Sequence, residues 1–117
     1  MVGVRLREVL VAGELAGECS GPGVSNGSAE HPVCGDHVQL SLRREGAAIV
    51  EARWRAAGCP ASVAVAALAA KVLTGVRVDE AAAVLRAAIA SHGGLAAHEG
   101  HAEAMALRAL AAATGRP

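Results

Sequence analysis

The sequence predicts an α+β domain in which helices pack on one side of a small antiparallel sheet. In the middle of the chain, two alternating runs of apolar and polar residues are joined by a short link that contains glycine, which is the pattern of a β-hairpin. After residue 59 the chain is rich in alanine, and apolar residues recur at helical spacing. No internal repeat is visible, so we expect residues 1–117 to form one domain.

The N-terminal part is expected to contain one helix and one loop. Over residues 4–16, apolar side chains recur at near-helical spacing with Arg and Glu between them, which predicts a helix packed on the sheet. The following run, GECSGPGVSNGSAEHP, is rich in Gly, Ser, Asn and Pro and therefore predicts a loop.

The hairpin is the clearest strand signal. Its first strand places Val38, Leu40 and Leu42 on one face, with polar residues between them. The link RREG, residues 43–46, predicts a polar, solvated turn. In the second strand we expect Trp54 to face the helices as part of the core.

Three helices should follow the hairpin. Pro60 suits a first helical turn, and the run PASVAVAALAAKVL is apolar nearly all round, which predicts a buried helix ending near Gly75. Asp79 is expected to cap the next helix, which ends at Gly93. A last helix is expected over residues 101–114.

Composition excludes several classes of function. With 11 basic and 11 acidic residues and a single aromatic one, the chain has neither the charge nor the stacking platforms of a nucleic-acid binder. No signal peptide is visible, and the run ASVAVAALAA is too short to span a membrane. Three cysteines, an odd number, argue against a disulfide framework. We therefore expect a reduced, cytoplasmic protein that binds neither nucleic acid nor membrane.

Four residues with metal-binding side chains are expected to meet. Cys34 precedes the first strand of the hairpin and Cys59 follows the second, so the two thiols should be neighbours in space. Cys59 begins a helix, where the helix dipole favours the thiolate. Asp36 is close to Cys34, and His101 starts the last helix. This set suits zinc or a mixed-ligand iron–sulfur cluster, although a cysteine in an alanine-rich chain can also be a buried apolar residue.

These residues carry a resemblance to a known family. The runs HPVCGDHVQLSL, ARWRAAGCPASVAVAALAAKVLTGVRVDEA and HAEAMALRAL resemble the NifU/IscU-type iron–sulfur cluster assembly scaffolds over about residues 31–113. The resemblance implies a NifU N-terminal or IscU-like (SufE-like) fold. It also implies that Cys34, Asp36, Cys59 and His101 hold a zinc ion or a nascent [2Fe–2S] cluster. Sulfur would arrive from a cysteine desulfurase on Cys34 or Cys59, and the cluster would pass to acceptor apo-proteins.

The sequence departs from the family pattern at one ligand. The family's third cysteine falls on Ala102, no Lys precedes His101, and the Asn-Pro-Arg-Asn type motif is absent. Cys19, in the predicted loop, is a candidate third thiolate, although an incidental free thiol is the commoner case. His98 and Glu99 are weaker candidates.

The remaining histidines are expected to lie outside the ligand set. On a strand, His37 should point to the opposite face from Asp36, toward solvent or a supporting position. His31 is predicted to lie in a surface loop and His92 at a helix end.

Three functional hypotheses follow. The first is a cluster assembly scaffold that accepts sulfur and is not itself an enzyme, since no nucleophile–base pair with a substrate pocket is recognisable. The second is a zinc-containing protein that relays a persulfide without assembling a cluster. The third is a metal-free interaction module with the scaffold fold. We expect the chain to act either as a monomer or as a homodimer in which the cluster bridges two copies.

Overall fold

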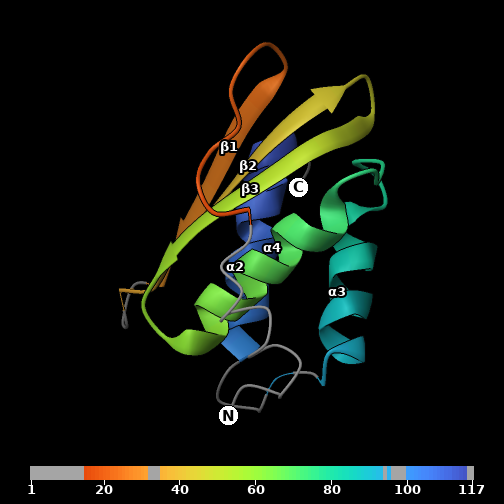
Figure 1. Cartoon of the computed structure of the whole chain (residues 1–117). Coiled ribbons are helices and arrows are strands. Elements are labelled where there is room, and N and C mark those ends of the chain that lie inside the picture. Colours follow the sequence, from red (N-terminus) through yellow and green to blue (C-terminus); the bar gives the residue numbers. More distant parts are fainter. Residues whose placement is uncertain (1–14, 32–34, 94, 96–99, 116–117) are drawn as a thin grey trace.

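A computed structural model describes residues 15–31, 35–93, 95 and 100–115 of the chain. Within these residues the element order is three strands followed by three helices, which is the predicted α+β class (Figure 1). The helix expected over residues 4–16 falls almost entirely outside the described residues. Of its last two positions, Leu15 lies in a turn and Ala16 forms an isolated bridge with Trp54.

The sheet contains one strand more than the sequence predicts. Strands β1 (Val24–Glu30), β2 (His37–Glu45) and β3 (Ala48–Ala57) form an antiparallel sheet in the order β1-β2-β3 (Figure 1). Strand β1 occupies the run that we expected to be a loop. Its residues have low strand propensity. They form a strand because they pair with β2 along the whole length of β1, which the composition of this run does not predict.

Strand β1 is also held by the last helix. A side chain at Gly27 would collide with backbone atoms of Ala109 and Ala113 in that helix, so glycine permits the close approach. Ser25 donates a hydrogen bond from its hydroxyl to the carbonyl of Ala113. The small and polar residues that resemble a loop are therefore the ones that let a helix lie directly on the strand.

The predicted turn between the hairpin strands was placed too early. Arg43 and Arg44 belong to β2, and the turn is formed by Gly46, at φ 61°, and Ala47. A bulge between the two arginines shifts the register of the hairpin. Arg43 is held in the strand by an ion pair with Glu51 on β3, at 3.2 Å.

The helices lie on one side of the sheet, as predicted. Helices α2 (Pro60–Leu73) and α4 (Gly100–Thr114) pack against the strands, whereas α3 (Ala81–Ser91) lies beside α2 away from the sheet (Figure 1). The prediction that Asp79 caps α3 is wrong. The residue at the N-cap is Glu80, which makes no side-chain cap. The Asp79 carboxylate is paired with Arg77 at 3.3 Å.

The core lies between the sheet and helices α2 and α4. It is built from the inward strand residues and an almost continuous set of alanines on the helices, whose small side chains bring the backbones close together. Trp54 is buried in this core, as predicted, with 8% of its surface exposed. No helix within the described part of the chain is long and apolar enough to cross a membrane.

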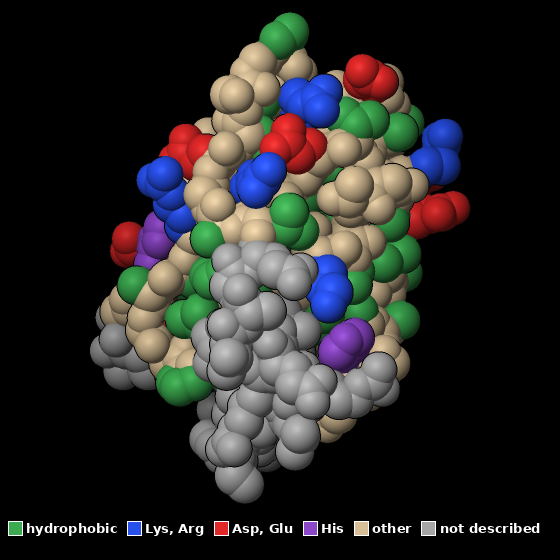
Figure 2. All heavy atoms as spheres, in the orientation of Figure 1, with side chains coloured by type: hydrophobic (Ala, Val, Ile, Leu, Met, Phe, Trp, Pro, Cys, Tyr) green, Lys and Arg blue, Asp and Glu red, His purple; other side chains and the backbone are tan. Residues whose placement is uncertain are grey.

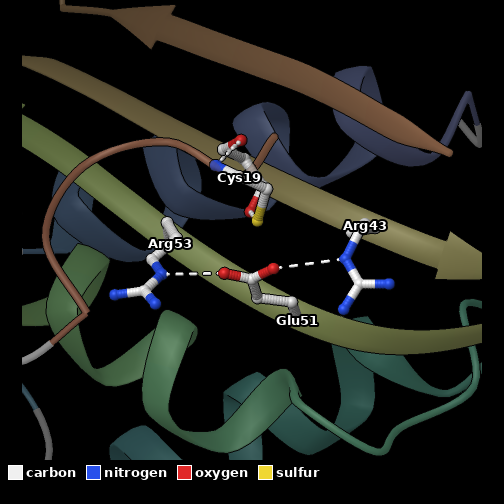
Figure 3. Close-up of polar contacts among 5 residues, drawn as sticks. Cys19, Arg43, Glu51 and Arg53 are labelled. Atoms are coloured by element: carbon white, nitrogen blue, oxygen red, sulfur yellow. Dashed lines mark hydrogen bonds and ion pairs between the residues drawn. The ribbon is translucent and has the colours of Figure 1, made fainter. Parts of the chain in front are cut away.

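The other face of the sheet carries charged residues and one buried thiol. Glu51 lies between Arg53 and Arg43, at 3.0 and 3.2 Å (Figure 3), and hydrogen bonds from these arginines lower the pKa of its carboxyl. Cys19 lies on the same face and is hydrogen-bonded to Ser41. Acidic and basic side chains are interspersed over the surface in Figure 2, as expected for a chain of zero net charge.

Candidate metal centre

One end of the sheet brings together residues from three parts of the chain. Asp36 immediately precedes β2, and Cys59 follows β3 as the N-cap residue of α2. The register pairs His37 with Ala57, which sets the start of β2 beside the end of β3. His101 is the second residue of α4, whose first turn reaches the same end of the sheet. The hairpin and two helix starts thus create the site.

The Asp36 carboxylate is the centre of this arrangement. It is 3% exposed and accepts three hydrogen bonds. The backbone N–H of Cys59 donates to Oδ1 at 3.1 Å, and the Ser62 hydroxyl donates to Oδ2 at 3.0 Å. His101 Nε2 lies 3.1 Å from Oδ2. Burial alone would raise the pKa of Asp36, but the bonds from Cys59, Ser62 and His101 outweigh it and lower the pKa.

A glycine makes room for the carboxylate. Gly58 has φ +117°, a conformation that side chains rarely adopt. A Cβ atom at Gly58 would also collide with the Asp36 carboxyl group. The glycine before Cys59 is therefore required both by the backbone turn from β3 into α2 and by the packing of Asp36.

The three side chains are arranged as metal ligands would be. One ligand atom each from Asp36, Cys59 and His101 lies within 4.8 Å of the other two. Cys59 Sγ and His101 Nε2 are 3.5 Å apart. Two such ligands on one tetrahedral zinc ion would lie about 3.5 Å apart, given usual Zn–S and Zn–N bond lengths. Thiolate, imidazole and carboxylate are all zinc or iron ligands, so the set fits a metal with little movement.

The family of the chain follows from comparison with known proteins. The family described as "NifU-like N terminal domain" matches residues 12–116. The chain belongs to this family. This assignment confirms the resemblance of the sequence to the NifU/IscU-type iron–sulfur cluster assembly scaffolds.

Named relatives agree with this assignment. The NifU-like domain is 38% identical over 112 residues to the "Bifunctional protein NifU/MnmA" of Rubrobacter xylanophilus, covering 92% of this chain and 22% of that protein. It is 37% identical over 59 residues to the "Iron-sulfur cluster assembly protein IscU" of Plasmodium falciparum, covering 50% of this chain and 36% of the relative. The chain thus spans about a fifth and about a third of the lengths of these relatives.

Solved structures show the same fold. A NifU-like protein (N-terminal) from Brucella abortus superposes with a TM-score of 0.67 at 18% identity, covering 93% of this chain and 86% of that one. The protein FiSufU from Fervidobacterium islandicum, assigned as an iron–sulfur cluster assembly scaffold for the SUF system, gives a TM-score of 0.71 at 18% identity, covering 94% and 93%. At this identity the likeness establishes the NifU-like fold.

The NifU-like domain brings together three of the predicted ligands. Asp36, Cys59 and His101 meet, whereas Cys34 lies outside the described residues, as do His98 and Glu99. That these side chains bind a metal remains a prediction. Ala102, which the sequence resemblance places where the family has its third cysteine, is completely buried.

Cys19 is not a third thiolate of this site. Its backbone N–H donates to Ser41 Oγ at 2.9 Å, and its thiol donates to the Ser41 carbonyl at 3.3 Å. Ser41 alternates with inward-facing leucines, so this contact lies on the sheet face away from the helices (Figure 3). Burial raises the pKa of the Cys19 thiol. This buried thiol, which is bonded to β2 on that face, does not belong to the group of ligand atoms at the metal centre.

Sequence reasoning missed two residues beside the site. Ser62 is fully buried and bonds to Asp36, and its Oγ is 3.6 Å from Cys59 Sγ. The spacing of three between Cys59 and Ser62, as in a capping box, could have indicated this. His31 was expected in a surface loop, but its ring packs edge-on against His101 with centroids 5.1 Å apart. Neither His37 nor His92 contributes an atom to the ligand group found among the described residues.

Proposed function

We propose that this NifU-like domain is a scaffold that binds a metal ion or a transient [2Fe–2S] cluster through Cys34, Asp36, Cys59 and His101. The observation that carries the proposal is the close grouping of Asp36, Cys59 and His101, in a domain whose family includes cluster assembly proteins. Cys34 joins the set by its place in the Cys-Gly-Asp motif, two residues before Asp36.

The chain's own residues prepare the site for a metal. Ser62 and the Cys59 N–H fix the Asp36 carboxylate, so that it is held close to the thiol of Cys59 and the imidazole of His101. His101 Nε2 lies 3.1 Å from Asp36 Oδ2, and any proton held between these two atoms must leave before Nε2 can bind a metal. When bound, the metal or cluster supplies Lewis acidity and a place for inorganic sulfide.

Sulfur would enter on Cys34 or Cys59. The acceptor thiolate attacks the outer sulfur of a persulfide on a cysteine desulfurase. One S–S bond forms while the donor's S–S bond breaks, and the donor leaves as a thiolate, so the exchange needs no added oxidant or reductant. Building a cluster from this sulfur would further require iron and a reductant that supplies two electrons per sulfur, and the assembled cluster would then pass to acceptor apo-proteins. This chemistry requires reduced thiols, so we propose a cytoplasmic location. We also propose that the protein acts as a monomer or homodimer and is not an enzyme.

A zinc-containing persulfide relay is the second candidate. The observation that favours it is the ligand set itself, because the described site offers a single thiol and Ala102 replaces the third cysteine. Clusters are held mainly by thiolates, whereas zinc accepts mixed sulfur, nitrogen and oxygen ligands. In this case the metal would be resident, and one cysteine would carry the sulfur.

Metal and acid-labile sulfide analysis separates these functions. The protein should be purified without oxygen or chelator, beside Cys34→Ser, Cys59→Ser and His101→Ala, with His92→Ala at the far end of α3 as the matched control. Iron and sulfide in equal amounts, lost in the first three variants, would support the scaffold. Zinc without sulfide, lost in the same variants, would support the relay. A wild-type protein without metal would refute both.

A further inference from the structure

A groove between helices α3 and α4 has no part in the proposed function. Its volume is about 460 Å³, which is within the usual range of ligand-binding pockets. One wall is formed by the residues just before α3 and by the first half of that helix, and the other wall by the second half of α4. The apolar part of its lining consists of Val78, Ala82, Leu107, Leu110 and Ala111. An apolar strip therefore runs between the two walls.

The groove runs along the two helices and not across them. Ala82 and Arg86 are one turn apart on α3, so this wall presents one stripe of its helix. Leu107 and Ala111 are one turn apart on α4 in the same way. The space stays open because both walls carry alanine, where a larger side chain would occupy part of it. An elongated occupant that lies beside the helices would fit this shape.

Each wall of the groove also carries an exposed arginine, Arg86 on α3 and Arg108 on α4. Neither forms an ion pair within the described part of the chain. Among the described residues that line the groove only Asp79 is acidic, and its carboxylate is already paired with Arg77 at 3.3 Å. Two guanidinium groups are thus left beside the apolar strip, where carboxylates on a partner would pair with them and basic groups would be repelled.

We propose that the groove binds an acidic amphipathic helix of a partner protein. Such a helix presents its apolar side chains in a stripe, at the same intervals of three and four residues as the walls of the groove. Glutamates or aspartates beside that stripe pair with Arg86 and Arg108. Leu107, the first groove residue on α4, is about 9 Å along the helix from His101, so the docked helix itself does not contact the metal centre. The inference goes beyond the proposed function and does not depend on metal binding.

The test is an NMR titration of the chelator-treated, ¹⁵N-labelled chain with a synthetic peptide of about four helical turns. The peptide carries leucines at i, i+3, i+4 and i+7 and glutamates on both sides of them. We expect saturable shifts of the amide signals that line the groove, and an affinity at least about tenfold weaker in Arg86→Glu/Arg108→Glu. The matched control is Arg55→Glu/Lys71→Glu, which changes the net charge equally at exposed positions outside the groove and should leave the affinity unchanged.

A charge exchange makes the test specific. The same peptide with lysine in place of every glutamate should bind Arg86→Glu/Arg108→Glu at least about tenfold more tightly than it binds the wild type, which damage to the fold could not produce. The inference is overturned if the acidic peptide causes no saturable shifts at the groove, or if a scrambled peptide without the leucine stripe binds equally well. It is also overturned if the same signals shift with protein concentration alone, because a second copy of the chain would then be the occupant. All these measurements use metal-free protein, so their failure leaves the proposed function untouched.

Discussion

Replacing Asp36 with alanine should destabilise the protein even when no metal is present. The carboxylate accepts bonds from the Cys59 N–H, at the start of α2, and from the Ser62 hydroxyl in the first turn. It therefore caps helix α2 from another element of the fold, since Cys59 makes no side-chain cap of its own. The variant Asp36→Ala removes this cap together with the bond to His101.

The expected loss is about 2–3 kcal/mol. A hydrogen bond to a charged group contributes about 1.5–3 kcal/mol, and loss of a helix cap typically costs about 1 kcal/mol. The contributions do not add fully, because the Ser62 hydroxyl can turn to another acceptor and His101, 24% exposed, can bond to water. Alanine also avoids the cost of burying a charge. For a chain of this size the loss corresponds to a midpoint roughly 10 °C lower.

The assay is urea unfolding of chelator-treated protein at pH 7. Asp79→Ala is the matched control, because Asp79 is an exposed aspartate whose pair with Arg77 should be worth less than about 0.5 kcal/mol. If metal-free Asp36→Ala unfolds within about 0.5 kcal/mol of this control, the capping argument is wrong, and Asp36 serves the metal alone.

The stability lost in Asp36→Ala should depend on pH. The folded-state pKa of Asp36 is lowered. Its contribution is therefore fully present above the unfolded value of about 3.9 and is lost as the pH falls through the folded value. The stability difference between wild type and Asp36→Ala should stay constant from about pH 7 to pH 5 and shrink below about pH 4. A difference that grew on acidification would contradict this reasoning.

Three further predictions test the packing of the domain. In urea unfolding, Gly58→Ala should lower the free energy of unfolding by about 1 kcal/mol or more beyond the loss in Gly75→Ala. Both glycines have positive φ, but only a side chain at Gly58 would clash with a neighbour, so equal losses would contradict this. Gly27→Ala should destabilise by about 3 kcal/mol or more, since its Cβ would meet the backbone of α4, and a thermal midpoint within about 3 °C of wild type would refute this. In metal-free protein, mass spectrometry after brief iodoacetamide treatment should find Cys19 modified more slowly than Cys59, because Cys19 is 7% exposed and burial raises its pKa; equal rates would contradict its burial.

The sequence predicts the helices and the central hairpin well because their signals are local. Pro60 and the long apolar run define α2, and the alternation through Leu40 and Trp54 defines two strands. Strand β1 could not be predicted in this way. Its residues favour turns. They form a strand because they pair with β2, and because Gly27 lets the backbone of α4 approach the strand closely.

The residues of the candidate site were likewise predictable only where the signal was local. Cys59 and Asp36 could be paired from sequence, because a hairpin brings the start of its first strand to the end of its second. Ser62 and His31 were missed because their roles depend on partners distant in the chain. Ser62 matters only once Asp36 lies over the first turn of α2, and His31 only once β1 has formed.

The edge strand therefore has a functional consequence that its sequence conceals. Because β1 pairs with β2 to its last residue, the chain leaves the sheet at His31, directly beside the carbonyl of Asp36. A loop in this place would leave the position of His31 undetermined, whereas the paired strand sets its ring edge-on against that of His101, with centroids 5.1 Å apart. The same pairing fixes the start of β2, and with it the carboxylate that caps α2. Helix stability and ligand geometry at this end of the molecule consequently depend on one short strand, held in place by a glycine packed against α4.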